Sequence, residues 1–165
     1  MYIRKAKSTD AKGIIEVNVK TWLTTYSGIM PQGILDHKKQ TINESIKQCE
    51  ATVEKDDNVL VALENEQIVG IASYGKAKSS ENESTGELYS IYVLKDFQGR
   101  GIGEKLFKEV TNILSNTGYK EMVVTCLKQN PYNKFYKKMG GEIIKVINSN
   151  IFGVELEENF IHFKI

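Results

Sequence analysis

The residues with the clearest chemical potential form a glycine-rich run at positions 98–103, with the sequence QGRGIG. Before it, residues 87–93 are rich in β-branched and aromatic side chains and predict a strand; after it, Ile102, Leu106 and Val110 recur at helical spacing. The first turn of a helix presents N–H groups with partial positive charge, and glycine lets an anion approach the backbone closely. The run therefore predicts a phosphate-binding turn between a strand and a helix.

Two familiar phosphate loops do not match this run. A P-loop ends in Gly-Lys-Ser/Thr, whereas Gly103 is followed by the residues EKL. A dinucleotide-binding fingerprint needs a third glycine where this chain has Glu104 in one register and Leu106 in the other. The run does match the pattern Gln/Arg-x-x-Gly-x-Gly, through Gln98, Gly101 and Gly103. In this respect the chain resembles the GNAT superfamily of acyl-coenzyme-A-dependent N-acetyltransferases.

A second motif carries the same resemblance. Asn130 and Pro131, followed by FYKKMG at 135–140, are similar to the family's fifth strand and a helix bearing Phe-Tyr. Residues 88–97 are similar to the fourth strand running into the family's pyrophosphate loop. The loop between Asn130 and Phe135 is one residue shorter than the commonest family form, and Asn133 stands where alanine is frequent.

The resemblance implies an α/β fold with a central mixed, mostly antiparallel sheet of about seven strands, splayed between strands 4 and 5 and flanked by about four helices. The splay lets the fourth strand's backbone bind the pantetheine arm as an added strand would, at Ile91 and Val93. The implied donor is acetyl-CoA, and no metal is expected. The residues implied to contact the donor are Ile91, Tyr92, Val93, Gln98, Gly99, Arg100, Gly101, Ile102, Gly103, Glu104, Asn130 and Tyr136.

Glu87 is the predicted general base. A strand from Glu87 to Val93 spans about 20 Å, comparable with the extended pantetheine arm, so a carboxylate would stand near the thioester. It could remove the proton that an ammonium acceptor must lose before attack, directly or through water, and its position matches the glutamate used as base in some family members. The alternatives are an exposed glutamate at the start of a strand, or a base supplied by waters or other residues.

Tyr136 is the predicted general acid. The resemblance places its phenol beside the thiolate leaving group, where the family tyrosine commonly donates a proton. The alternative is an aromatic side chain that only packs on its helix.

The cysteines and histidines indicate neither a metal site nor a disulfide framework. Cys49 lies in a polar helix-like stretch and Cys126 in an apolar strand-like one, with no CxxC or Cys/His pattern. Covalent acyl transfer through Cys126 is disfavoured, because an apolar strand opposes thiolate formation. His37 and His162 have no paired partner in sequence, and His162 on the last strand is a candidate for the substrate end.

Length and composition narrow the class of protein. The chain has 165 residues, of which 41% are hydrophobic, and this predicts one domain over 1–165 with a sizeable core. Its net charge of +1 argues against a nucleic-acid role carried by overall charge. No apolar h-region follows the N-terminal MYIRK, and no aliphatic run is long enough to span a bilayer, which predicts a soluble cytoplasmic protein without a membrane partner.

Strands are predicted from period-two and β-branched patterns at 2–6, 59–64, 67–74, 87–93, 119–127, 142–147 and 160–165. Asn65 and Glu66 separate two of these and predict a hairpin. Residues 78–85 predict a mobile loop.

Helices are predicted from apolar spacing and from their end residues. One follows the possible caps at 8–10 and runs to about residue 25, with a packed stripe of Ile15, Val19, Trp22 and Tyr26, whose two aromatics are also candidates to line a pocket. Pro31 starts a second helix at its first position and extends it through 46. The third follows the glycine turn, with Glu104 opening it, and runs to about residue 116, where Gly118 stops it. Asn130 caps a short fourth with Pro131 in its first position, and its predicted apolar face is Tyr132, Phe135, Tyr136 and Met139.

The predicted activity is transfer of an acetyl group from acetyl-CoA to a primary amine within a ternary complex. A polyamine, a small metabolite, an antibiotic or a peptide N-terminus all fit as acceptor, shaped by residues 22–30 and 78–85. Three alternatives stay open: a different acyl-CoA donor, a non-catalytic CoA-binding sensor, and an interaction domain with no phosphate ligand. A homodimer also stays open.

Overall fold

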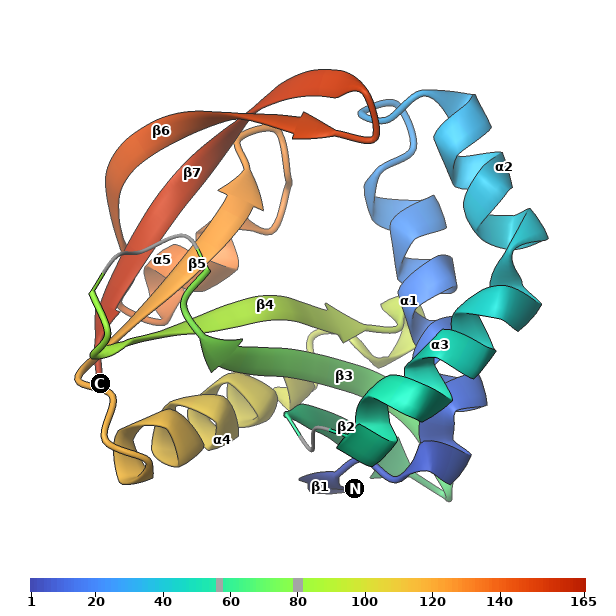
Figure 1. Ribbon diagram of the computed structural model, residues 1–165, viewed down its shortest axis with the longest axis horizontal. Coiled ribbons are helices and arrows are strands. Elements are labelled where there is room, and N and C mark those ends of the chain that lie inside the picture. The colour runs from blue at the N-terminus through green and yellow to red at the C-terminus, as the bar shows by residue number, and fades with distance from the viewer. Residues whose placement is uncertain (56–57, 79–81) are drawn as a thin grey trace. The chain divides into compact units, whose positions relative to one another are not determined.

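A computed structural model describes residues 1–55, 58–78 and 82–165 (Figure 1). Its seven strands form one mixed sheet in the order β1-β2-β3-β4-β5-β7-β6, which confirms the predicted α/β class. In chain order the elements are β1 (Tyr2–Lys5), α1 (Ala11–Thr25), α2 (Gln32–Gln40), α3 (Ile42–Lys55), β2 (Val59–Glu64), β3 (Gln67–Lys76), β4 (Thr85–Val93), α4 (Ile102–Asn116), β5 (Glu121–Leu127), α5 (Asn133–Lys138), β6 (Glu142–Ile151) and β7 (Val154–Lys164).

The chain divides into two compact units. The first comprises Met1–Tyr74 and Ser90–Val110, and the second comprises Gly75–Tyr89 and Thr111–Ile165. Strand β4 passes from the second unit into the first between Tyr89 and Ser90. The single domain expected over 1–165 stays a prediction.

The first unit builds its core between helices and a hairpin. Asn65 and Glu66 adopt left-handed backbone conformations (φ 49° and 63°), as a tight β2–β3 turn requires, so the predicted hairpin is confirmed. Ile14 and Val17 of α1 pack with Val61 of β2 and Ile71 of β3 in one apolar cluster. The strands therefore present one face to α1.

The predicted packing stripe on α1 is partly wrong. Val19 and Tyr26 are buried, but Ile15 and Trp22 are only half-buried. Thr21 and Thr25 are buried instead, and the Thr21 hydroxyl donates to the Val17 carbonyl at 2.7 Å. The helix can bury Thr21 because its hydroxyl bonds the helix backbone, a possibility that apolar spacing does not reveal. The buried Thr25 hydroxyl has no hydrogen-bond partner among the described residues.

The segment after Pro31 forms two helices rather than the single predicted one. Pro31 precedes α2 as its N-cap residue instead of occupying its first turn, and Thr41 separates α2 from α3. The Thr41 N–H makes the last helical bond of α2, to the His37 carbonyl at 3.0 Å, and the Thr41 hydroxyl donates to the same carbonyl at 2.9 Å. The backbone of Thr41 (φ −99°, ψ 20°) departs from helical values, and the first helix ends there. The described residues therefore contain five α-helices, one more than expected.

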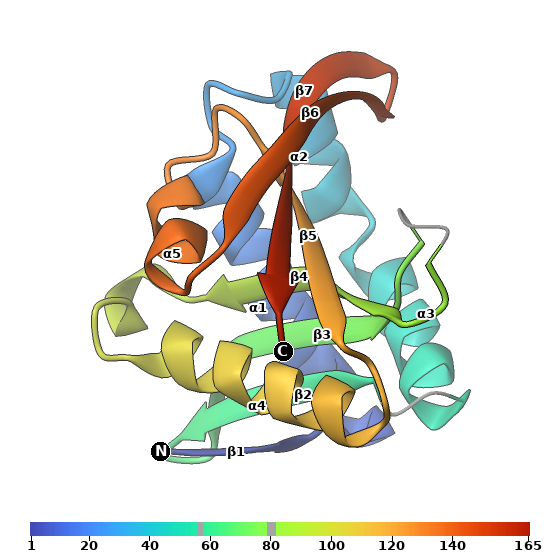
Figure 2. The same cartoon turned by 90° about the vertical axis from the view of Figure 1, so that its left-hand side faces the viewer.

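The second unit is built on β5, β6 and β7. Strand β5 pairs antiparallel with β7 over its whole length, and β7 pairs with β6 as a long hairpin (Figure 2). Residues 148–159, which the sequence left unassigned, extend both strands to a turn at Phe152 and Gly153, where both residues have positive φ. Ala77, Val123 and Phe160 form a core cluster here.

The predicted splay between β4 and β5 has a counterpart in the strand pairing. Within the described residues, the two strands pair in parallel at Thr85↔Glu121, Gly86↔Met122 and Glu87↔Val123. Strand β5 continues to Leu127 along β7, and β4 continues to Val93, so parallel pairing covers only the first part of each strand.

The predicted loop at 78–85 lies partly outside the described residues, at 79–81. Among the helices that the structure describes, none combines the length and the apolar character needed to cross a membrane.

Candidate functional site

The turn between β4 and α4 takes its shape from two glycines. Gly99 and Gly101 have φ values of 74° and 77°, a region that glycine enters without steric cost. A Cβ at either position would meet no atom within 4 Å, so backbone conformation rather than crowding requires glycine. The Lys105 N–H donates to the Gly101 carbonyl at 3.1 Å, which starts the helical bonding, and the N–H groups of the preceding residues point out of the helix end. This backbone can approach an anion.

Side chains within the turn hold that backbone in place. The Gln98 amide donates to the Val93 carbonyl at 2.9 Å, and Arg100 donates to the Asp96 carbonyl at the same distance. The Arg100 guanidinium also lies 5.1 Å from the Phe97 ring centre. Gln98 and Arg100 therefore brace the turn, and the surface available to a ligand is mainly backbone.

Helix α4 is anchored where it leaves the turn. Ile102, Leu106 and Val110 are buried, which confirms the helical spacing read from the sequence. A Cβ added to Gly70 of β3 would come within 3.1 Å of the Leu106 side chain and 3.3 Å of that of Ile102. The glycine lets α4 approach β3 closely and so fixes where the helix begins.

The end of β4 contacts α1 through an aromatic pair. Ile91, Tyr92 and Val93 are half-buried, and the Trp22 indole N–H donates to the Tyr92 hydroxyl at 3.1 Å. Trp22 also lies against Tyr26, with ring centres 4.6 Å apart. The Lys38 ammonium also contacts Trp22, at 4.1 Å from the ring centre. The sequence pointed to Trp22 and Tyr26 as candidates to line a pocket, but it did not point to Lys38. In the sequence, Lys38 is one of two adjacent lysines of a predicted helix, with nothing to distinguish it from its neighbour.

Glu87 is buried at 6% exposure. Its Oε2 accepts a hydrogen bond of 2.7 Å from the Lys78 backbone N–H, which holds the carboxylate against the segment after β3. The alternative, a glutamate exposed at the start of the strand and without a catalytic role, is wrong in its exposure. Its role as a base stays a prediction.

Tyr136 is the buried aromatic of α5, at 8% exposure, with Phe135 edge-on at 5.3 Å between ring centres. Tyr132 is 39% exposed, so the apolar face is narrower than predicted. The helix begins at Asn133, which makes the expected cap wrong: Pro131 lies before the helix, and the Asn130 side chain accepts from the Tyr132 N–H at 2.8 Å in a separate turn.

Asn133 organises the approach to α5. Its amide donates to the carbonyls of Leu127, Lys128 and Asn130 at 2.9, 3.2 and 2.8 Å. Its oxygen accepts from the buried Asn159 of β7 at 3.0 Å. The residue that departs from the family pattern thus ties together the end of β5, the start of α5 and β7.

The other nucleophile and histidine candidates have structural surroundings. Cys126 is buried, and burial together with the nearby Glu158 raises the pKa of its thiol to about 12. Burial also raises the pKa of Cys49 on α3. His162 lies 3.5 Å from a Glu121 carboxylate oxygen, and His37 is exposed.

The predicted donor-binding residues fall into both units. The continuous segment 90–110 of the first unit carries the predicted strand and turn residues, from Ile91 to Glu104. The second unit holds Glu87, Asn130 and Tyr136.

Comparison with known proteins decides the family. Residues 20–141 match the model of the acetyltransferase (GNAT) family. The chain belongs to the GNAT family. This GNAT chain is 32% identical over 157 residues to the uncharacterized N-acetyltransferase YuaI of Bacillus subtilis, covering 94% of this chain and 88% of that protein.

Two further relatives are named for an activity or a ligand. The L-amino acid N-acyltransferase MnaT of Escherichia coli is 29% identical over 130 residues, covering 79% of this chain and 72% of MnaT. The structure of yncA from Salmonella typhimurium, described as a putative acetyltransferase with its cofactor acetyl-CoA, superposes with a TM-score of 0.73 at 24% identity, covering 99% and 93% of the two chains. These matches establish an acetyltransferase fold and family.

Proposed function

We propose that this GNAT protein transfers an acetyl group from acetyl-CoA to a primary amine in a ternary complex. The observation that carries the proposal is the β4–α4 turn: two positive-φ glycines with open space around them, at the amino end of an anchored helix. Backbone N–H groups at a helix start favour a phosphate without a dedicated cationic side chain. The pyrophosphate of the donor would lie on residues 99–103.

The turn fits the donor because its own side chains leave the backbone accessible. Gln98 and Arg100 bond inward to carbonyls of the same segment, and a Cβ-sized space outside Gly99 and Gly101 is open. From the turn, the arm would run along β4 beside Ile91 and Val93. The short parallel pairing between β4 and β5 supports this path, because β4 extends well beyond it.

Acid–base chemistry would come from two buried residues. Glu87, held by the Lys78 N–H, would accept the proton that the acceptor ammonium must lose, directly or through water. Tyr136 would donate its phenolic proton to the departing thiolate as the C–S bond breaks. The newly bonded nitrogen still carries one proton too many, and its loss, directly or through water, would restore the phenol; the products are then the amide, the free thiol and one proton held by Glu87.

Direct transfer is favoured over an acyl-cysteine route. A thiol with a pKa of about 12 is almost wholly protonated at neutral pH, so Cys126 is a poor nucleophile. Orienting the two reactants would therefore carry much of the rate enhancement.

For partners and location, we retain the sequence expectations as part of the proposal. The acceptor is an amine on a small molecule or a peptide, the enzyme is cytoplasmic, and neither nucleic acid nor membrane takes part. The proposed activity is compatible with a monomer and with a homodimer.

The test is an acceptor screen with acetyl-CoA in which thiol release is corrected for hydrolysis. Amine-dependent release supports transfer, and repeating it with longer acyl-CoA donors defines the acyl group. Tight CoA binding without turnover on any amine would favour a sensor instead. Absence of a thermal shift with CoA would contradict the assignment of the turn.

A further inference from the structure

Lys38 on α2 has unusual surroundings for a lysine of this chain. Its side chain is half-buried, its ammonium donates to the Asn18 side-chain oxygen at 3.2 Å, and it lies 4.1 Å from the Trp22 ring centre. Burial lowers the pKa of Lys38. No carboxylate in the described part of the chain pairs with it, so its surroundings supply only neutral partners.

The neighbouring lysine shows the contrast. Lys39 is exposed and lies 3.8 Å from Asp36 on the same helix. Asp36 in turn accepts from Gln32 at 2.9 Å. On α2, Asp36 therefore pairs with the exposed Lys39. Lys38 instead contacts Asn18 and Trp22 of α1, and within the described residues no carboxylate pairs with it. A partly desolvated ammonium of this kind gains more from an incoming anion than a fully hydrated one does.

The contacts of Trp22 bring this ammonium close to the proposed donor strand. The ring beneath Lys38 belongs to the side chain whose indole N–H bonds the Tyr92 hydroxyl on β4. Ile91 and Val93, on either side of Tyr92, are the positions proposed to hold the pantetheine arm. All of these residues belong to the first unit.

We propose that Lys38 binds a carboxylate of the acceptor, so that the acceptor class is amines that also carry a carboxylate, such as amino acids. This inference rests on the proposed acetyl transfer and extends it to substrate selection. Lys38 acts as a specificity determinant: it bonds the anionic end of the acceptor while the amine faces the donor. Asn18 and Trp22 hold the ammonium in position.

The experiment compares amino acids with their carboxamides in acetyl-CoA assays of the wild type and Lys38→Met. Methionine keeps an apolar stem over the Trp22 ring but removes the charge. We expect kcat/KM to fall about tenfold or more for each amino acid and to stay within about twofold for its carboxamide. Taking the variant-to-wild-type ratio for each acceptor cancels the difference in amine basicity between acid and amide.

The controls separate charge from folding. Lys39→Met removes the neighbouring paired lysine and should leave both ratios unchanged, whereas Lys38→Arg should retain the preference for the acid. Thermal unfolding of each variant reports on stability. If Lys38→Met does not fold, two measurements still test the proposal. The wild type must prefer each amino acid over its carboxamide after correction for the fraction of free amine, and Lys38→Arg must retain that preference.

Equal losses on acids and amides, or no loss on acids, would overturn the role of Lys38. Wild-type transfer to amides with no preference for acids would overturn it too, while leaving acetyl transfer intact. Absence of transfer to both acceptor types would overturn this inference, while the proposed acetyl transfer would be decided separately by the screen of other amines.

Discussion

Two strand-to-helix junctions of the molecule are built in opposite ways. The β4–α4 junction turns on the positive-φ residues Gly99 and Gly101, with open space where their side chains would be. The β5–α5 junction is filled by its own side chains, because Asn133 bonds three carbonyls and Asn159 bonds Asn133. The first leaves backbone accessible to a ligand, and the second uses hydrogen bonds to hold the helix that carries Tyr136.

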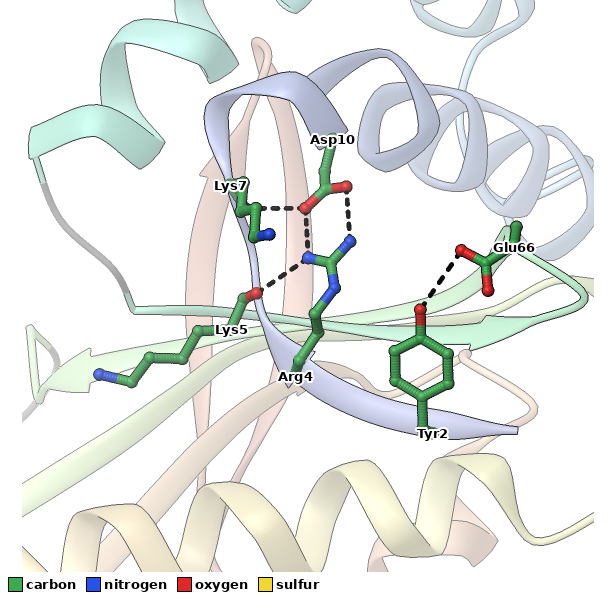
Figure 3. A network of polar contacts seen from close by, with 6 residues as sticks. All are labelled: Tyr2, Arg4, Lys5, Lys7, Asp10 and Glu66. Atoms are coloured by element: carbon green, nitrogen blue, oxygen red, sulfur yellow. Dashed lines mark hydrogen bonds and ion pairs between the residues drawn. The ribbon is translucent and has the colours of Figure 1, made fainter.

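A third junction, between β1 and α1, is closed by charge (Figure 3). Arg4 donates two hydrogen bonds to Asp10, at 2.6 and 2.9 Å, and the Lys7 N–H donates to the same carboxylate at 2.7 Å. The Arg4 guanidinium, and secondarily the Lys7 N–H, hold the pKa of Asp10 below its ordinary value. Of the three junctions, the one with open space beside its glycines is the one that we propose binds the donor.

The largest expected effect comes from filling the open junction. Gly101→Asp adds a side chain at φ 77° and a negative charge beside the proposed pyrophosphate, so CoA affinity should fall about 1,000-fold or more. Calorimetric titration with CoA measures it. Gly153→Asp places the same change at an open positive-φ glycine of the β6–β7 turn and should leave affinity unaltered. If Gly101→Asp bound CoA as tightly as Gly153→Asp does, the β4–α4 turn would not be the pyrophosphate site.

The second prediction concerns Glu87, the proposed base on β4, the strand before the β4–α4 junction. Glu87→Gln should lower kcat about 100-fold at neutral pH and alter the pH profile, because an amide cannot accept the proton, while CoA affinity is largely retained. Glu83→Gln changes an exposed carboxylate of the same unit and serves as the control. A wild-type pH profile in Glu87→Gln would exclude Glu87 from the mechanism.

An effect of similar size should come from the helix that the filled junction holds. Tyr136→Phe keeps the packed ring but removes the proton donor, so single-turnover acetyl transfer should slow about 100-fold. Tyr132→Phe changes the neighbouring exposed phenol and should transfer at the wild-type rate. An unchanged single-turnover rate in Tyr136→Phe would show that this tyrosine only packs.

Opening the filled junction should reduce stability. Asn133→Ala removes the donor to three carbonyls and the acceptor of buried Asn159, which should lower the free energy of unfolding by about 2 kcal/mol. Urea denaturation measures the change, with Asn148→Ala on the exposed part of β6 as the matched control. Equal stability of the two variants would mean that the amide network contributes little.

The smallest effect is expected at the charged junction, and it depends on pH. Because the folded-state pKa of Asp10 is depressed, its stabilisation is present above the ordinary value of 3.8 and is lost as pH falls through the folded pKa. Asp10→Asn should therefore cost about 1 kcal/mol at pH 7 and progressively less below pH 4. Asp36→Asn, which removes a carboxylate from an exposed pair, is the control variant. A cost independent of pH would indicate that packing rather than charge closes this junction.

Local patterns predicted much of the fold. The strand at Val59–Glu64 was predicted with its observed bounds, and α4 was predicted to end where it does, at Asn116, because strand alternation and helical spacing act over a few residues. The start of α4 was predicted at Glu104, two residues later than the observed Ile102. The same patterns failed where side-chain hydrogen bonds intervene. Thr21 is buried on α1, where its hydroxyl bonds the Val17 carbonyl, and Thr41, whose backbone leaves helical values, lies between two helices.

In the candidate site, too, some features follow from local sequence and others only from tertiary packing. The sequence alone determined the glycine turn, because left-handed φ values and helix starts depend on adjacent residues. It also indicated the GNAT family, through the two motifs at 98–103 and 130–140. Only the tertiary structure decided that Asn159 of β7 holds Asn133, that Trp22 joins Lys38 to Tyr92, and that Glu87 is buried. These pairs come from segments far apart in the chain, and their contacts depend on how strands and helices pack together. No local spacing encodes that packing, whereas the conformation of the turn that we propose binds phosphate depends on its own six residues, 98–103.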